Sequence, residues 1–233
     1  MDQTSPHLKV NQELLEIIPR VDSLCEVGCS YGALAEAYKK YNNKCNYIGI
    51  EIDKKFAIEA AKRCDKVYWG NFEEILENSF HLDGINPQCW IFGDVLEHLY
   101  DPWLVLRQLH DTMPESGFIC ACIPNMQHWS IQCKILTGNL FYETKGLLNR
   151  THIRWFTKKS IEEMFCRAGF ELDIIKPKNI SLSIPDYLER SIKFSAIPLG
   201  IDAEELIDLA RPLQYVVRAK KISKNYWFPR DIP

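Results

Sequence analysis

Short apolar runs and segments of helical spacing alternate between residues 23 and 123, and this alternation limits the chain to few folds. The apolar runs with the length of buried strands are Ser23–Val27, Asn46–Glu51, Lys66–Trp69, Gln88–Gly93 and Gly117–Ile123. Between them, residues 31 to 41 and the stretch around Ala57, Ala60 and Ala61 have the spacing of helices packed on a sheet. Strands that alternate with helices form parallel sheets covered on both faces. We therefore expect a doubly wound α/β fold.

The regular alternation stops after the fifth run. Pro124–Phe156 is a long segment rich in Asn, Trp, Tyr, Arg and His. Loops of this length are usually functional or disordered, and the aromatic content argues against disorder. Thr157 then predicts the start of a helix, with Ser160 as an alternative start one turn later, and Gly169 predicts its end.

Two further strands complete the expected sheet. They are Phe170–Ile175 and Gln214–Ala219, and the segment 177–212 between them is interpreted as an insertion with a helix at Ala203–Leu209. We expect a single domain over residues 1–222, in which the insertions 124–156 and 177–212 cap the ligand-binding edge of the sheet. Residues 223–233 form a C-terminal tail.

Charge and hydropathy argue against two classes of protein. The 28 basic and 31 acidic residues give a net charge of -3, so no global positive field attracts a nucleic-acid backbone. No apolar stretch reaches the roughly 20 residues that span a bilayer, and the first residues lack the order of a secretory signal. We expect a soluble cytoplasmic protein without a nucleic-acid partner. The basic segment 211–233 is either solvated surface or a peripheral contact with anionic lipid, and the oligomeric state stays open.

Nine cysteines are a high and odd number for an intracellular chain. None belongs to a CxxC pair, which argues against a structural zinc site. Five of them lie in or beside apolar runs, namely Cys25, Cys45, Cys89, Cys120 and Cys122. We interpret the cysteines as reduced thiols that pack as small hydrophobic side chains. Cys29 keeps a functional option, because an exposed thiol in its turn would be alkylated and a bound ligand would protect it.

Residues 25–32, with the sequence CEVGCSYG, predict a strand, a glycine turn and the start of a helix. Gly28 and Gly32 have no side chain that would keep a ligand from the backbone. The nicotinamide-binding pattern GxGxxG is not met, because three residues separate these glycines. Glu26 precedes the first glycine, where its carboxylate suits an amine or a cation and would repel a pyrophosphate.

The next two strands end in matching polar side chains. Glu51 ends the second strand, at the place of the acid that holds a ribose diol in doubly wound nucleotide sites. Asn71 follows the third strand, where its amide suits an adenine edge, and Phe72 stacks or packs beside it. A ribose, an adenine and a positively charged tail together describe S-adenosylmethionine (SAM).

Several motifs follow one another in a characteristic order. They are Glu26-x-Gly28-x-x-x-Gly32, Gly49-Ile50-Glu51, Gly70-Asn71 and Gly93-Asp94-Val95-Leu96-Glu97-His98-Leu99-x-Asp101-Pro102. The later runs are Pro124-Asn125-x-x-His128-Trp129-Ser130 and Gly146-Leu147-Leu148-x-Arg150-Thr151-His152-x-Arg154-Trp155-Phe156-Thr157. Over residues 10–176 this order resembles the class I SAM-dependent methyltransferases. The later runs resemble a bacterial branch that accompanies glycosyltransferases in surface-polysaccharide synthesis.

The resemblance implies a Rossmann-like fold, with a seven-stranded, mostly parallel sheet and an antiparallel last strand. It implies SAM as cofactor, with S-adenosylhomocysteine as its product. The cofactor-binding residues that we assign are Glu26, Gly28, Cys29, Ser30, Tyr31, Gly32, Glu51, Ile52, Asn71, Phe72, Asp94 and Leu96. Ser30 departs from the usual Gly, Asn71 from the usual Asp, and Asn149 from an Asp that often precedes the Arg-Thr-His run.

The long segment supplies the candidates for the methyl acceptor. An aliphatic hydroxyl needs a general base at neutral pH, most often His, and we assign His152 and His128 as the candidate catalytic residues. The candidate substrate-binding residues are Asn125, Trp129, Arg150 and Arg154, since the arginines suit a phosphate or carboxylate. The alternative is that the Arg-Thr-His-x-Arg run only ties the segment down. The aromatic residues Trp129, Phe141, Tyr142, Trp155 and Phe156 form either a platform for a sugar ring or a small core.

The acids Asp94, Glu97 and Asp101 lie on one loop with His98. For the acids we expect cofactor-loop and capping roles, for His98 packing and loop anchoring, and no metal. The expected reaction is O-methylation of a sugar hydroxyl in a nucleotide sugar or glycan precursor. Two alternatives stay open, namely N- or O-methylation of another small natural product and a SAM-binding regulatory module without catalysis.

Overall fold

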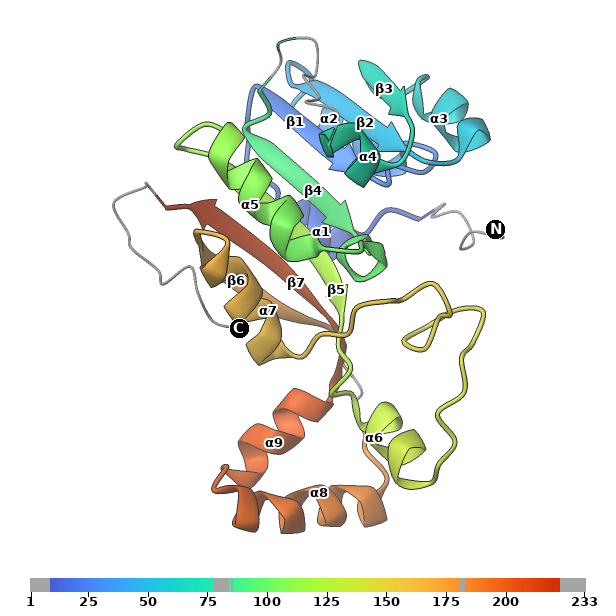
Figure 1. Ribbon diagram of the computed structural model, residues 1–233, viewed down its shortest axis with the longest axis vertical. Coiled ribbons are helices and arrows are strands. Elements are labelled where there is room, and N and C mark those ends of the chain that lie inside the picture. The colour runs from blue at the N-terminus through green and yellow to red at the C-terminus, as the bar shows by residue number, and fades with distance from the viewer. Residues whose placement is uncertain (1–8, 78–83, 85, 181–182, 223–233) are drawn as a thin grey trace.

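The computed structural model describes residues 9–77, 84, 86–180 and 183–222, which form a seven-stranded sheet with helices on both faces (Figure 1). The strands are β1 (Ser23–Val27), β2 (Asn46–Glu51), β3 (Lys66–Trp69), β4 (Cys89–Gly93), β5 (Phe118–Pro124), β6 (Phe170–Ile180) and β7 (Pro212–Lys221). Their order is β3-β2-β1-β4-β5-β7-β6. Strands β1 to β5 pair in parallel, and β7 is antiparallel to β5 and β6. The predicted sheet with an antiparallel last strand is confirmed.

Two layers of helices cover the sheet. Successive side chains of a strand point to opposite faces, and both faces carry apolar side chains that the helices bury. These elements are α1 (Gln12–Ile17), α2 (Ala33–Lys39), α3 (Lys54–Ala60), α4 (Phe72–Glu77), the 3₁₀ turn η1 (Leu96–His98), α5 (Pro102–Thr112) and α7 (Lys158–Arg167). In β1, Leu24 packs in a cluster with α1 and α2, whereas Cys25 packs in a cluster with α5 and α7. Burial on both faces explains why the strands are continuous apolar runs.

Two predicted helix caps are present. Asp101 Oδ1 accepts a hydrogen bond from the Leu104 amide at 2.8 Å and caps α5. Thr157 and Ser160 cap α7 reciprocally, so the first of the two predicted starts is correct.

A separate lobe follows the carboxyl ends of β5 and β6 (Figure 1). It contains α6 (Trp129–Leu136), α8 (Asp186–Leu199) and α9 (Ala203–Ala210). Leu188, Ile192 and Ile207 form its own small core. The prediction of α9 is confirmed, whereas α6 and α8 were not predicted, and β6 continues beyond residue 177 to Ile180.

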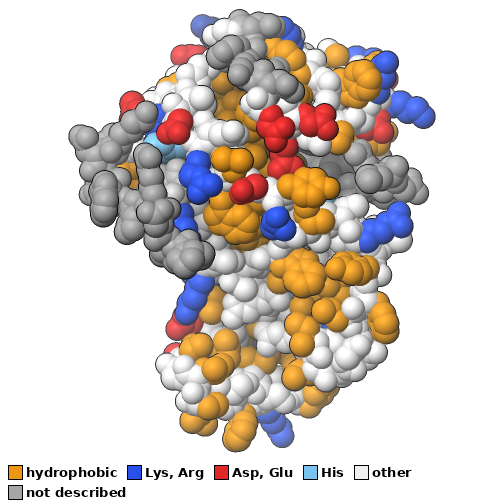
Figure 2. Space-filling view, viewed as in Figure 1, with side chains coloured by type: hydrophobic (Ala, Val, Ile, Leu, Met, Phe, Trp, Pro, Cys, Tyr) orange, Lys and Arg blue, Asp and Glu red, His pale blue; other side chains and the backbone are white. Residues whose placement is uncertain are grey.

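Outward-facing apolar side chains explain why α6 and α8 were missed. Figure 2 shows apolar side chains over much of this lobe. The most exposed on α6 and α8 are Leu136, Tyr187, Phe194, Ile197 and Leu199. When both faces of a helix carry apolar residues, the 3.6-residue periodicity that identifies a helix in a sequence is obscured.

All nine cysteines lie in the described part of the chain and are free. Seven are buried, while Cys133 and Cys166 are half-buried, so their interpretation as packing residues is confirmed. The exposure on which the option for Cys29 depended is absent, because this residue is 3% exposed and its sulfur lies against Gly49. A buried thiol of this kind is shielded from alkylation.

Basic residues near the end of β7 pair with acids of the same fold. Arg218 contacts Asp173 at 2.7 Å, and Lys221 contacts Glu115 at 3.1 Å. These side chains therefore support the edge of the sheet, and the expected tail 223–233 lies outside the described residues. Within the described ranges, no helix has the length and apolar character needed to cross a bilayer.

Gly49 permits close packing beneath the turn that follows β1, and this generates a prediction. A Cβ at this position would lie 2.6 Å from Cys29 Sγ. We expect Gly49→Ala to lower the free energy of unfolding by about 1–3 kcal/mol, because a packed core accommodates an added methyl group poorly. Adding Cys29→Ala removes the sulfur, so the double variant should lose less than the sum of the two single losses. Urea denaturation of the four proteins measures the cycle, and additive losses would contradict this contact.

Candidate functional site

The turn between β1 and α2 has a backbone conformation that most side chains avoid. Gly28 and Gly32 have φ angles of 71° and 76°, and Ser30 between them has 49°. The Gly28 amide donates to the Ile50 carbonyl at 2.8 Å, which ties the turn to the end of β2. A Cβ on Gly28 would come within 2.8 Å of Val95 Cγ2. Glycine therefore allows the turn to lie close to the end of β4.

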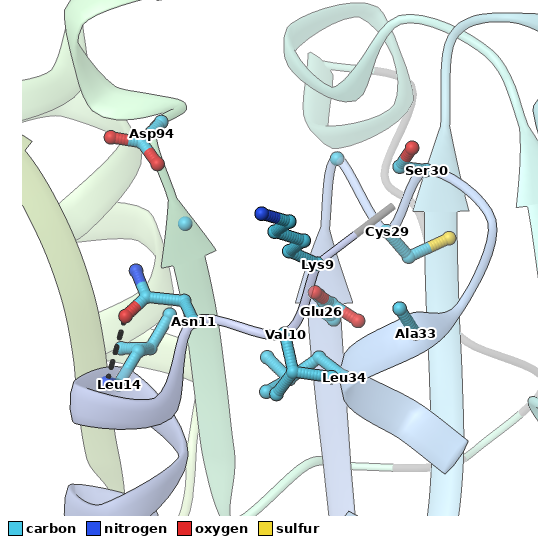
Figure 3. Close-up of a pocket in the computed structure, with 12 residues that line it drawn as sticks. Lys9, Val10, Asn11, Leu14, Glu26, Cys29, Ser30, Ala33, Leu34 and Asp94 are labelled. Carbon is cyan, nitrogen blue, oxygen red and sulfur yellow. Dashed lines mark hydrogen bonds between the residues drawn. The ribbon is translucent and has the colours of Figure 1, made fainter. Parts of the chain in front are cut away.

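A recess opens beside this turn at the carboxyl ends of β1 and β4 (Figure 3). Its lining includes Asn11, Glu26, Gly28, Ser30 and Asp94. Ser30 Oγ is buried here and has no hydrogen-bond partner among the described residues. Because buried polar atoms are normally paired, this hydroxyl is suited to contact a polar ligand.

Glu26 gives the recess an acid whose charge depends on its ligand. Its carboxylate is buried and accepts a hydrogen bond from Tyr47 Oη at 2.7 Å. Burial raises the pKa of Glu26 to about 8, and the Glu51 charge adds to this rise, whereas the Tyr47 hydrogen bond opposes it. A cation in the recess would favour the ionised form, as expected for a side chain that complements a positive tail.

Glu51 is held in one orientation at the end of β2. Its two carboxylate oxygens accept hydrogen bonds from the amides of Ser30 at 2.7 Å and Asp53 at 2.9 Å. Burial raises the pKa of Glu51, and these amide bonds oppose that rise. An acid that binds a ribose diol needs such fixed oxygens. The structure thus brings Glu26, Ser30 and Glu51 to the same edge of the sheet.

The other predicted cofactor residues at this edge are on the surface or partly buried. Tyr31 packs on Phe56, with ring centroids 4.6 Å apart, and Ile52 is exposed after Glu51. Asp94 lines the recess, and its Oδ1 accepts a hydrogen bond from the side-chain Nε2 of Gln214. These positions lie beyond the ends of β1, β2 and β4.

Three assigned cofactor contacts need revision. Asn71 Oδ1 accepts a hydrogen bond from the Glu73 amide at 2.9 Å and caps α4, so this oxygen is engaged by the helix. Phe72 and Leu96 are buried in the core of the sheet, and their side chains support the site from below. The sequence alone does not show that these apolar side chains turn inward after the strand ends.

One of the assigned substrate contacts, Asn125, is wrong. Asn125 is fully buried, and its amide donates to the carbonyls of Leu209 at 3.0 Å and Pro212 at 2.9 Å. Its Oδ1 accepts from the Gln127 amide at 3.0 Å, so the side chain is fully used in anchoring the lobe. Trp129 is partly buried and packs against the core of the lobe, and its Nε1 has no hydrogen-bond partner among the described residues, so it stays a candidate.

The assignment of His128 as a catalytic base is also corrected. His128 is 4% exposed, and its Nδ1 caps α6 by accepting from the Ser130 amide at 3.3 Å. Burial lowers the pKa of its imidazole. The neutral His128 ring therefore stabilises the start of α6, and its burial keeps it from contacting an acceptor.

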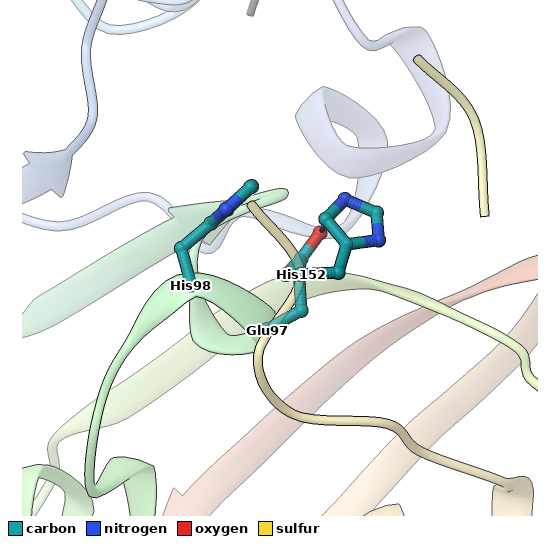
Figure 4. Close-up of side chains that lie close together, drawn as sticks. All are labelled: Glu97, His98 and His152. Atoms are coloured by element: carbon teal, nitrogen blue, oxygen red, sulfur yellow. Dashed lines mark ion pairs between the residues drawn. The ribbon is translucent and has the colours of Figure 1, made fainter. Parts of the chain in front are cut away.

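His152 lies in a different setting, beside Glu97 and His98 (Figure 4). His152 Nε2 is 3.9 Å from Glu97 Oε1, and the two imidazole centroids are 4.8 Å apart. Burial lowers the pKa of His152, and the neighbouring His98 adds to this effect. Burial and the Asp94 charge raise the pKa of Glu97 well above its usual range. Of the two predicted catalytic histidines, His152 is therefore the one that lies among other titratable groups.

Backbone hydrogen bonds hold the loop that carries His152. The amides of Ile153 and Arg154 donate to the Glu97 carbonyl at 2.9 and 3.0 Å. The Arg154 guanidinium donates to the Tyr100 carbonyl, which agrees with the alternative that this residue ties the segment down. Arg150 is exposed and stays a candidate for contact with an anionic acceptor.

Sequence reasoning missed Tyr47 and Gln214, which contact Glu26 and Asp94 from other strands. Both contacts depend on which strands are neighbours. Tyr47 offered a signal, since a buried tyrosine hydroxyl within a strand usually has a hydrogen-bond partner. The sequence around Gln214 contains no comparable signal.

Comparison with known proteins identifies the family. The family model described as "Methyltransferase domain" matches residues 7–174. A sequence comparison with curated proteins finds no match. Among solved structures, a SAM-dependent methyltransferase from Archaeoglobus fulgidus is similar over 90% of each chain, with a TM-score of 0.61 and 17% identity.

Two other solved structures share the fold. A SAM-dependent methyltransferase from Mesorhizobium loti matches over 90% of this chain and 96% of its own, with a TM-score of 0.58 and 13% identity. The plantazolicin methyltransferase, solved with S-adenosylhomocysteine, matches over 91% of this chain and 79% of its own, with a TM-score of 0.52 and 15% identity. The structures show a common fold, and the family model covers most of the sequence. The chain belongs to the methyltransferase domain family.

Proposed function

We propose that this methyltransferase uses SAM to O-methylate a sugar hydroxyl in a nucleotide sugar or glycan precursor of surface polysaccharide. The observation that carries the proposal is the pair of buried carboxylates, Glu26 and Glu51, on either side of the glycine turn. In this proposal Glu26 pairs with the cationic tail of SAM, Glu51 holds the ribose diol, and Ser30 Oγ supplies a neutral contact. When bound, SAM supplies an electrophilic methyl group on a positively charged sulfur.

The segment 139–156 supports a sugar as the acceptor. Phe141, Tyr142 and Trp155 are exposed on it, and exposed aromatic rings suit stacking on a sugar. Arg150 supplies a positive charge for a phosphate of a nucleotide sugar. His152 promotes loss of the proton from the acceptor hydroxyl, and the lobe covers the acceptor. The nine free thiols suit a reducing compartment, so we place the enzyme in the cytoplasm.

A panel of nucleotide sugars with SAM tests the acceptor class. Formation of S-adenosylhomocysteine together with a methylated sugar would support the proposal. Turnover only with amines or other small natural products would favour the alternative of N- or O-methylation of another small natural product. SAM binding without turnover on any acceptor would indicate a regulatory module.

Glu51→Gln tests the cofactor site. The amide keeps the size of the side chain but loses the charge that strengthens hydrogen bonds to the ribose hydroxyls. We expect SAM affinity to fall about 10- to 100-fold, since a hydrogen bond to a charged group contributes roughly 1.5–3 kcal/mol. Isothermal titration calorimetry measures the change. Glu59→Gln, on the exposed side of α3, is the matched control and should bind like the unmodified protein.

The raised pKa of Glu26 predicts a pH-dependent affinity for SAM. Free Glu26, with a pKa of about 8, is largely protonated at pH 6.5 and largely ionised at pH 8.5. Because the cationic tail pairs with the ionised form, SAM affinity should rise about 25-fold over this range. In Glu26→Gln the affinity should be weaker at pH 8.5 and should lose this rise. The same slope in both proteins would show that Glu26 is not the titrating group.

Substitution of the two histidines separates their roles. His152→Asn keeps a donor near the position of Nδ1 and removes Nε2, so we expect turnover to fall at least 100-fold with SAM affinity unchanged. His128→Asn substitutes one helix-capping residue for another and should retain turnover within about threefold. Steady-state kinetics on the identified acceptor gives both values. Normal turnover of His152→Asn would remove His152 from the reaction.

A further inference from the structure

Glu97, His98 and His152 form a compact group of potential metal ligands at the carboxyl end of β4. One ligand-type atom from each residue lies within 4.8 Å of the others (Figure 4). No other such trio gathers in the part of the chain that the structure describes. Two members come from η1 and the third from a loop more than 50 residues later, so only the folded chain creates the group.

Both imidazoles are oriented by backbone carbonyls. His98 Nδ1 lies 2.9 Å from the Thr151 carbonyl, and His152 Nδ1 lies 3.0 Å from the Leu147 carbonyl. A carbonyl oxygen only accepts hydrogen bonds, so each Nδ1 carries the proton and the lone pair of the neutral ring is on Nε2. Histidines that bind metals are commonly held in this way, with the second ring nitrogen donating to a carbonyl or carboxylate.

Glu97 is the second observation that points to a ligand. Its side chain is fully buried, and neither carboxylate oxygen has a hydrogen-bond partner among the described residues. An unpaired buried carboxylate is costly, whereas a cation would neutralise it. The 3.9 Å between Glu97 Oε1 and His152 Nε2 is slightly longer than the roughly 3–3.5 Å between atoms that lie about 2.1 Å from one ion. Binding one ion therefore requires the three ligand atoms, which lie up to 4.8 Å apart, to move closer together.

We propose that Glu97, His98 and His152 bind one divalent cation of the class that includes Zn²⁺, Mn²⁺, Fe²⁺ and Co²⁺. Two imidazoles and one carboxylate suit these ions, whereas Mg²⁺ and Ca²⁺ prefer oxygen ligands. The proposal reverses the expectation of a metal-free enzyme. Three protein ligands leave coordination positions open, as in catalytic metal sites.

The catalytic consequence rests on the proposed methyl transfer. An acceptor hydroxyl in an open position of the cation loses its proton to water more easily. Its oxygen then bonds to the methyl carbon while the carbon–sulfur bond breaks, and the electron pair of that bond stays on sulfur. In this arrangement His152 Nε2 holds the cation and does not itself take the proton.

Titration of the full chain with Co²⁺ tests the site without reference to activity. The absorption bands of protein-bound Co²⁺ should saturate at one ion per chain. Glu97→Gln and His152→Asn should each weaken binding at least 10-fold, while Glu143→Gln, on the exposed part of the same segment, should bind normally. Circular dichroism and SAM affinity show whether each variant is folded. No saturable binding, or equal binding in all four proteins, would overturn the site.

Removal of the metal tests its part in the reaction. After treatment with EDTA, formation of S-adenosylhomocysteine should fall at least 100-fold and return when Mn²⁺ or Zn²⁺ is added. Full activity in EDTA would disprove the catalytic role of the cation and leave the proposed methyltransferase function intact. Saturable Co²⁺ binding in a protein that methylates no tested acceptor would support the metal site while the proposed function fails.

Discussion

Three carboxyl groups, from Glu26, Glu51 and Glu97, are buried at the carboxyl edge of one sheet, and the site depends on how each is stabilised. Burying a carboxylate removes its water, so a folded chain must supply partners or favour the protonated form. Glu51 has two backbone amides, Glu26 has one tyrosine hydroxyl, and Glu97 has no hydrogen-bond partner among the described residues. The number of donors therefore falls from Glu51 to Glu26 to Glu97. The fold itself stabilises the ionised form of Glu51, whereas a cationic ligand would stabilise the ionised forms of Glu26 and Glu97.

The parallel strands explain why these groups meet. Parallel strands all present their carboxyl ends at the same edge, and loops beyond that edge form the ligand site of a doubly wound fold. Strand β6 is parallel to β5 through the intervening antiparallel β7, so both insertions also emerge at this edge. The lobe formed by α6, α8 and α9 therefore follows the same edge of the sheet, and Asn125 anchors it by hydrogen bonds to the carbonyls of Leu209 and Pro212.

His128 and His152 show how hydrogen bonding separates two histidines of the same segment. His128 Nδ1 accepts from the amide of Ser130 and completes a helix end. His152 Nδ1 faces a carbonyl, so it donates and leaves the lone pair on the other nitrogen, toward Glu97. The first arrangement uses the lone pair for structure, and the second leaves it available for chemistry.

The sequence by itself determined the sheet, because apolar runs and glycine turns are local features that burial on both faces requires. It also indicated Glu26 and Glu51 as candidate cofactor-binding residues, since each lies at the carboxyl end of a predicted strand. It did not reveal α6 and α8, whose outward apolar side chains hide the helical period. The sequence also did not show that the side chains of Phe72 and Leu96 turn into the core and away from the recess. Only the tertiary structure decided the contacts between distant segments, such as Tyr47 with Glu26 and His152 with Glu97, because strand order and loop anchoring depend on the packing of the whole chain.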